Sequence, residues 1–158
     1  MNGQTGDERD RVMADWLRRQ GVDPARCRPL GGDASTRRYC RVTTPGGARV
    51  VMDAPGQAST CEAFLHVQRL MTGAGLHVPR VEAADSGLGF MLLEDLGRVD
   101  YLATLAGGER ERLLDDALAA LIRWQMATRD GVLARFDRAR LADELALFPV
   151  WYVQRHLG

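Results

Sequence analysis

Lysine is absent from this chain of 158 residues, so all 21 of its basic residues are arginine. Without a lysine amine, the chain cannot form a Walker A phosphate loop, a Schiff base or a lysine phosphate clamp. Asparagine is almost absent too, because Asn2 is the only one. Any phosphate contact by a cationic side chain must therefore come from arginine, whose planar fork suits phosphate oxygens.

Cysteine and histidine are also scarce, with three of each in the whole sequence. The cysteines, Cys27, Cys40 and Cys61, are odd in number and fit neither a CxxC metal motif nor a dense disulfide scaffold. The histidines show no HExxH spacing, so we expect no metal site made by this chain alone. The cysteines are interpreted as small core residues of a protein in the reducing cytoplasm.

The sequence has no excess charge of either sign and no long apolar run. Its 21 acidic and 21 basic residues cancel, which gives a pI near 6.8. This balance argues against a nucleic-acid or membrane-surface partner, and the apolar runs are too short to cross a bilayer. The first twelve residues contain no apolar signal core, so the expected location is the cytoplasm.

What is present is a change of pattern along the chain. Helical periodicity over residues 7–21 places Trp16 and Leu17 on one face. A second helix, within 61–75, has Ser59 or Thr60 as its expected N-cap and is expected to end at Gly73. Short strand patterns with turn residues between them are expected at 27–30, 37–43, 48–54, 78–85 and 89–96. Two longer helical stretches follow, at 109–128 and at 139–158, the latter interrupted at Pro149.

This segregation predicts an α+β fold, because the strands occupy one part of the chain and helices the other. We expect a sheet-rich domain over residues 1–95 and the start of a helical domain over 96–158. The stretch "GGDASTRRYCRV", residues 31–42, is unusually polar for a connection between two strands. It fits either a solvated hairpin or a cradle for phosphate.

Four stretches in order carry a resemblance: "LGGDASTRRYCRV", "VVMDAP", "GFMLLEDLG" and "ELALFPVWYVQRHLG". Together they resemble the aminoglycoside-phosphotransferase and choline-kinase-like superfamily. Within it they are most similar to the bacterial anomeric kinases that phosphorylate N-acetylmuramate and N-acetylglucosamine at the sugar 1-position, in cell-wall recycling. The resemblance covers residues 16–158. It implies a protein-kinase-like small lobe, with an antiparallel sheet of about five strands plus a helix, followed by the first helices of a helical lobe.

The resemblance also implies that ATP or GTP, with Mg2+, is bound by the small lobe. Glycines that reach positive φ would let the backbone approach the phosphates, main-chain N–H groups would form an anion nest, and hydroxyl and guanidinium groups would add donors. Because side chains alternate along a strand, at most one of Arg37 and Arg38 is expected to face the phosphates. We favour Arg38, because it shares a strand face with Cys40 and Val42 and that apolar face would continue beneath the base. The residues expected here are Gly31, Gly32, Asp33, Ser35, Thr36, Arg37 and Arg38.

Two other stretches complete the expected nucleotide site. Backbone groups around Glu94, Asp95 and Leu96 would hydrogen-bond the base at the hinge. The third strand departs from the protein-kinase pattern, since Met52 or Asp53 stands near the usual lysine. The phosphate contact of that lysine stays open between Arg41 and Arg49.

The catalytic residues of this superfamily are not found in the sequence. Phosphoryl transfer on this fold needs a catalytic aspartate, an asparagine and a second aspartate for metal. No HxDxxxxN or DFxD stretch occurs. We therefore expect an inactive N-terminal fragment that self-associates through its helices. We expect the sugar to contact Glu144, Trp151 and Tyr152; the alternative is that these residues belong to the core of the helical lobe. The alternative function for the whole chain is a non-catalytic kinase-like module that binds nucleotide or a partner.

Overall fold

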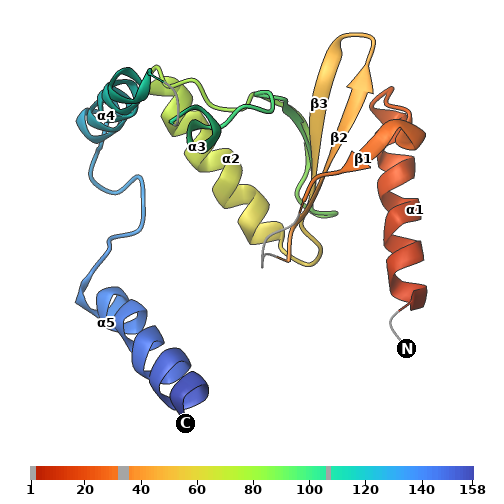
Figure 1. Ribbon diagram of the computed structural model, residues 1–158. Coiled ribbons are helices and arrows are strands. Elements are labelled where there is room, and N and C mark those ends of the chain that lie inside the picture. The colour runs from red at the N-terminus through yellow and green to blue at the C-terminus, as the bar shows by residue number, and fades with distance from the viewer. Residues whose placement is uncertain (1–2, 32–35, 106–107) are drawn as a thin grey trace. The chain divides into compact units, whose positions relative to one another are not determined.

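A five-stranded antiparallel sheet is the centre of the structure, a computed structural model that describes residues 3–31, 36–105 and 108–158 (Figure 1). The strand order β1-β2-β3-β5-β4 confirms the expected α+β fold with a kinase-like small lobe. The two-residue turn Pro45–Gly46 joins β2 to β3, and Gly47 follows it with φ +107°. The strands are β1 (Cys27–Pro29), β2 (Arg38–Thr44), β3 (Gly47–Asp53), β4 (Val81–Asp85) and β5 (Phe90–Glu94).

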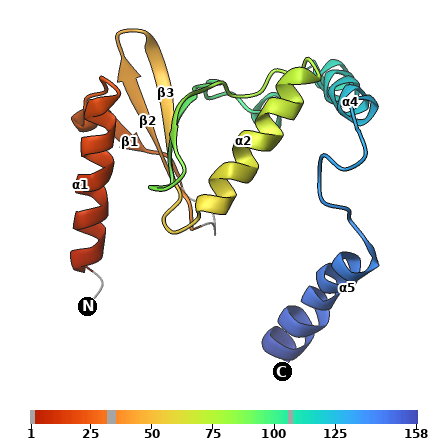
Figure 2. The same cartoon turned by 180° about the vertical axis from the view of Figure 1, so that it is seen from behind.

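Helix α1 (Gly3–Arg19) covers one face of the sheet. Its buried Trp16 and Leu17 pack on this face, and the Trp16 ring lies 5.6 Å from the ring of Phe90. The helix runs beside the first three strands in both views (Figures 1 and 2). The predicted apolar side of α1 is therefore confirmed. The sheet residues buried under it are Cys40, Val42, Val51, Phe90 and Leu92.

Helix α2 (Ala58–Gly73) packs on the opposite face, because alternate residues of β3 and β5 point that way. Cys61 of α2 is fully buried against Met52 and Met91, and Phe64 and Leu65 are packed at the edge of this cluster. The predicted end of α2 at Gly73 is confirmed. These two helices, one on each face, bury the sheet that the alternating sequence predicted.

The expected N-cap of α2 was wrong. Gln57 is the residue before the first helical turn, and Ser59 and Thr60 lie inside that turn. The chain turns earlier than expected because Gly56 adopts φ +67°, and the Gln57 carbonyl then accepts the N–H groups of Thr60 and Cys61. The Gln57 side chain makes no capping hydrogen bond to this helix end.

After β5, all the regular elements in the described residues are helices. Asp100 and Asp137 cap α3 (Tyr101–Thr104) and α5 (Arg138–Leu147), accepting backbone N–H groups at 2.7 Å and 3.0 Å. The remaining helices are the short 3-10 turn η1 (Pro24–Arg26), α4 (Arg110–Met126) and the π-helix η2 (Phe148–Leu157).

The sequence predicted an interruption at Pro149, and the structure shows a change of helix type beside this residue. Pro149 has no N–H to donate to the carbonyl four residues earlier, so the α-helical pattern ends at Leu147 and continues as η2.

The described residues divide into two compact units, one up to Trp124 and one from Gln125. The boundary expected after residue 95, between the sheet-rich domain and the helical one, stays a prediction. From residue 96 onward, no described residue is buried. Within the described parts of the chain, no helix combines the length and apolarity that a membrane span needs.

Candidate functional site

The polar loop before β2 is described at Gly31 and from Thr36 onward; Gly32, Asp33 and Ser35 lie outside the described residues. Gly31 is exposed but is not among the glycines with positive φ, so the expected left-handed conformation is wrong at this position. Thr36 is tied to the start of α2, because its hydroxyl oxygen accepts a short hydrogen bond from the Gln57 amide. The end of the loop is thus held beside the first turn of α2.

Arg37 and Arg38 lie on opposite sides of the sheet, as the alternation of β2 predicted. Arg37 is half-buried and lines a cavity against α2, together with Thr60 and Phe64. Arg38 lies on the α1 side and forms an ion pair with Asp10 of that helix at 2.8 Å. Only one of the two arginines can therefore serve a ligand on a given face.

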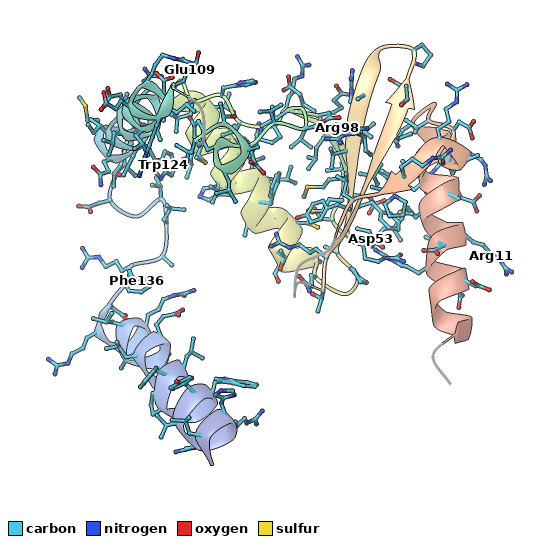
Figure 3. All side chains as sticks on the ribbon, in the orientation of Figure 1. Arg11, Asp53, Arg98, Glu109, Trp124 and Phe136 are labelled. Carbon is cyan, nitrogen blue, oxygen red and sulfur yellow. The ribbon has the colours of Figure 1, made fainter. Side chains whose placement is uncertain are left out.

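Asp53 is the charge that holds Arg38. Its carboxylate is 2% exposed and accepts hydrogen bonds from Nε and Nη2 of Arg38 at 2.9 Å and 2.5 Å. Its other oxygen accepts the same two groups of Arg9, at 3.0 Å and 2.6 Å. Figure 3 shows Asp53 between the sheet and α1. Two forked guanidinium contacts can neutralise a buried carboxylate, so this cluster joins α1, β2 and β3.

The reason for favouring Arg38 as the phosphate ligand was wrong. We expected the apolar face that it shares with Cys40 and Val42 to continue beneath the base. In the structure, α1 covers that face with Trp16 and Leu17. The alternation of β2 identifies the residues on this face, but it does not reveal that α1, which precedes β1 in the chain, packs on it.

The hinge end of the sheet has its own ion pair. Nε and Nη2 of Arg41 donate to the two carboxylate oxygens of Asp95 at 2.5 Å and 2.8 Å, and Nη2 also donates to the Gly97 carbonyl at 2.8 Å. The hydrogen bond from Arg41 is the main cause that lowers the pKa of Asp95 below its usual value. Arg41 therefore fixes the hinge to β2, whereas the sequence suggested a phosphate contact.

One of the expected hinge donors, the Glu94 N–H, is already occupied, and so is the N–H of Gly97, which follows the expected hinge residues. The N–H of Glu94 donates to the Arg80 carbonyl at 2.8 Å, and the N–H of Gly97 donates to the Asp95 carboxylate at 2.9 Å. The Glu94 N–H is thus not available to a base in this structure. Leu96, which follows the Arg41–Asp95 pair, is 53% exposed.

The two remaining candidates for the nucleotide site on β3 are Met52 and Arg49. Met52 is fully buried between the sheet and α2, so its side chain belongs to the core and is not exposed to a nucleotide. Arg49, the other open candidate for the phosphate contact, pairs with Glu82 at 2.6 Å.

The loop and the hinge lie at opposite ends of the sheet. Arg38 is in register with Asp53 and Phe90, whereas Val42 is in register with Arg49 and Glu94. Four residues of β2 separate the two ends, which corresponds to about 13 Å. This is on the order of the length of an extended nucleoside triphosphate.

The expected sugar residues lie in the second unit, and all three are exposed. Glu144 lines a polar cavity of about 320 Å3 with Arg140 and Asp143 of the same helix. The Tyr152 ring stacks on the rings of Phe148 and His156, which belong to the same helix. The Arg155 guanidinium lies 4.2 Å from the centre of the Trp151 ring. The structure thus places the two aromatics on η2 and Glu144 on the preceding helix α5.

Magnesium ions need several oxygen ligands, usually carboxylates and phosphates. Among the residues that the structure describes, no group of three His, Cys, Asp or Glu side chains is placed to hold a metal ion. We therefore assign the ion to no described residue of this chain.

Sequence reasoning missed the Arg9–Asp53 contact and its link to Asp10. A partial signal was present, because Asp53 is the one charged residue at the end of an otherwise apolar run, "VVMDA". A buried acid in such a run needs a cationic partner. The sequence did not say which of 21 arginines would supply it.

Comparison with known proteins gives the class. The phosphotransferase enzyme family (APH) matches residues 26–158, so the chain belongs to this family. It is therefore a member of a kinase and phosphotransferase family by homology.

The individual relatives narrow the class. A protein of Pseudomonas aeruginosa named N-acetylmuramate/N-acetylglucosamine kinase is 48% identical over 87% of this chain and 40% of its own length. Proteins of the same name from Neisseria meningitidis serogroup B and Caulobacter vibrioides are 38% and 30% identical, over 96% and 82% of this chain. The chain covers 46% and 43% of those two relatives, and so spans less than half of their length.

Proposed function

We propose that the chain is the nucleotide-binding part of a kinase that uses ATP or GTP, with Mg2+, to phosphorylate the anomeric hydroxyl of N-acetylmuramate or N-acetylglucosamine. The observation that carries the nucleotide part is the register of the sheet, which sets a polar loop and a hinge about 13 Å apart. The names of the relatives support the sugar part. A role in cytoplasmic cell-wall recycling belongs to the same proposal.

The nucleotide would lie on the α2 side of the sheet, along β2 and beside the helix, because α1 covers the other face and α2 packs mainly on β3 and β5. Along that face, Arg37 is at the loop end, Tyr39 follows, and Arg41 closes the hinge end. Arg37 would neutralise phosphate oxygens, while Arg41 would act indirectly by holding the hinge. No residue of the chain is assigned to the chemical step, since the sequence contains no catalytic-loop aspartate motif.

Nucleotide binding tests the first part of the proposal. Three proteins are titrated with Mg-ATP and Mg-GTP by calorimetry: the parent chain, Arg37→Ala and the control Arg69→Ala. The control changes an exposed arginine of α2. A charged hydrogen bond contributes about 1.5–3 kcal/mol, so Arg37→Ala should weaken binding by roughly 10- to 150-fold. Equal affinities for all three chains would contradict the phosphate role of Arg37.

Sugar phosphorylation tests the second part. The chain alone, with Mg-ATP and N-acetylmuramate, should give no sugar phosphate. A fusion to the part of the P. aeruginosa relative that follows its matched region should give a product whose anomeric proton couples to phosphorus. Product from the chain alone, lost on mutating one of its residues, would contradict the proposal of an incomplete enzyme.

A second candidate function is a non-catalytic module that binds nucleotide or a partner protein. It is favoured by the described residues, among which no group of three His, Cys, Asp or Glu side chains is placed to hold a metal ion. An inactive fusion protein that still binds nucleotide would support this alternative.

A further inference from the structure

We propose that Cys27 and Cys40 form a reversible disulfide, so that β1 and β2 carry an oxidation site for hydroperoxides. The two sulfur atoms lie 2.6 Å apart, and both cysteines are free. That separation exceeds the S–S bond length of about 2.0 Å by only about half an ångström. The contact joins edge strand β1 to its neighbour.

The position of the pair follows from strand register. Cys27 is opposite Val42 and Cys40 is opposite Pro29, so the two cysteines are diagonal neighbours across the antiparallel pair. Diagonal side chains on one face of such a pair are within reach of each other. The sequence interpretation treated all three cysteines alike, as core residues. The structure separates them, because Cys61 is fully buried on the other face, in the α2 cluster.

The two sulfurs differ in accessibility and in acidity. Cys27 is half-buried, whereas Cys40 is 9% exposed. Cys40 donates its thiol hydrogen to the Cys27 sulfur, and this hydrogen bond lowers the pKa of Cys27 and raises that of Cys40. The thiolate is the nucleophilic form of cysteine, so Cys27 reacts first and Cys40 second.

A cavity gives a small oxidant access to this pair. Both cysteines line a cavity of about 320 Å3, whose other walls include Met13, Leu17 and Pro24. Peroxide is small enough to enter such a space.

The reaction balances with a hydroperoxide as the oxidant. The Cys27 thiolate attacks one peroxide oxygen, the O–O bond breaks, and hydroxide leaves, which makes Cys27 a sulfenic acid. The Cys40 sulfur then attacks the Cys27 sulfur, the S–S bond forms, and the S–O bond breaks. The leaving hydroxide takes the Cys40 proton as water. Two thiols and one hydrogen peroxide thus give one disulfide and two waters, and a dithiol reductant reverses the change.

The disulfide would join the chain on the two sides of the polar loop, residues 31–37. Cys27 lies on one side of residues 31–37 and Cys40 on the other, so the bond closes a segment that contains the whole loop. A cross-link that fits the native geometry raises stability by restricting the unfolded chain. This consequence does not depend on what the loop binds.

The test uses the purified chain, reduced and then freed of reductant. Hydrogen peroxide should remove two of three thiols and lower the mass by about 2 Da, the loss of two hydrogens. Trypsin leaves each cysteine on a different peptide, so the linkage can be read directly. The peptides are 27–37, 39–41 and 50–69, and the first two should be joined. Retention of all three thiols, a link to Cys61, or only linked dimers would overturn the proposal.

Two variants and one stability measurement complete the test. Cys61→Ser should still form the bond, and Cys27→Ser should not. Oxidation of the parent chain should raise Tm by roughly 5–10 °C, and dithiothreitol should reverse the change. Since the parent needs no substitution, a folding defect in a variant cannot obscure the result. If the disulfide forms but lowers Tm, the native fold does not hold the two cysteines in the geometry of the bond. That result would also overturn the proposal.

Discussion

At the scale of single residues, Asp53 shows how a buried charge can organise a small domain. Its carboxylate is almost fully buried, but both oxygens receive paired donors from Arg9 and Arg38. A buried ion pair is weak evidence for stability in itself, because desolvation offsets much of the attraction. Loss of one partner is a different matter, since the carboxylate stays buried with half of its donors.

Arg9→Ala should therefore destabilise the chain. It removes two bonds to Asp53, one to the Leu88 carbonyl and the contact with the Phe90 ring. We expect the free energy of unfolding to fall by about 2 kcal/mol, measured by urea denaturation. The control is Arg18→Ala on the same helix, whose ion pair with Asp15 is exposed and should contribute less than about 0.5 kcal/mol. Equal effects of the two substitutions would contradict this role for Asp53.

Gly89 is a second residue whose identity the structure requires. It has φ +76°, and a Cβ there would lie 2.3 Å from the Ala54 carbonyl oxygen. That oxygen belongs to the backbone directly after the central strand β3, where the Ala54 N–H also donates to the Gly89 carbonyl. Gly89→Ala should cost about 2 kcal/mol or more of stability, by thermal unfolding. Gly87→Ala in the same turn is the control, since its nearest atom would be 3.5 Å away. An unchanged stability of Gly89→Ala would contradict this requirement and show that the turn relaxes to accept a Cβ.

At the scale of helices and strands, the sequence predicted most of the sheet. Alternation and turn residues located all five strands, because a half-buried strand has period two and its ends need turns. The start of α2 was not predicted, since it depends on the left-handed Gly56 rather than on a capping side chain. Pro149 was interpreted correctly because its effect is local.

The candidate site was less predictable, because its contacts are long-range. The alternation of β2 placed Arg37 and Arg38 on opposite faces, but only packing shows that α1 covers the Arg38 face. The Glu94 N–H was expected to be available, yet it bonds Arg80, which lies before β4. Local sequence patterns specify which residues share a face, and tertiary contacts decide which groups remain open to a ligand.

The Arg41–Asp95 pair joins an element to the hinge and should respond to acid. Because the folded-state pKa of Asp95 is lowered, its carboxylate stabilises the fold above the unfolded pKa, about 3.9. This contribution is lost as the pH falls from about 4 through the folded pKa. Asp95→Asn should therefore lower Tm at pH 7 and differ little from the parent near pH 2. The control is Asp115→Asn, an exposed position of α4. A Tm difference that is independent of pH would contradict this account.

At the scale of the whole molecule, burial is unevenly distributed along the chain. Every buried residue among those described lies at or before Leu93. The second unit, from Gln125, contributes none, although its helices carry many apolar side chains. The chain also spans less than half the length of its relatives. The apolar side chains of these helices are therefore exposed to water in this chain.

We expect this surface to drive self-association. Leu145, Phe148 and Trp151 are 67%, 64% and 56% exposed on the continuous helical segment formed by α5 and η2. Exposed apolar side chains gathered on one segment favour association when nothing covers them. Sedimentation velocity should show dimers or larger species that increase with concentration.

The double variant Leu145→Gln and Trp151→Gln should shift that distribution toward monomer, because it removes two of the most exposed apolar side chains of the segment. The matched control is Leu102→Gln on α3, where the leucine is 81% exposed but lies outside the second unit. It should leave the association unchanged, because a single apolar side chain elsewhere does not extend the surface of α5 and η2. A parent chain that sediments as one monomeric species at every concentration would show that these helices do not associate, despite their exposure.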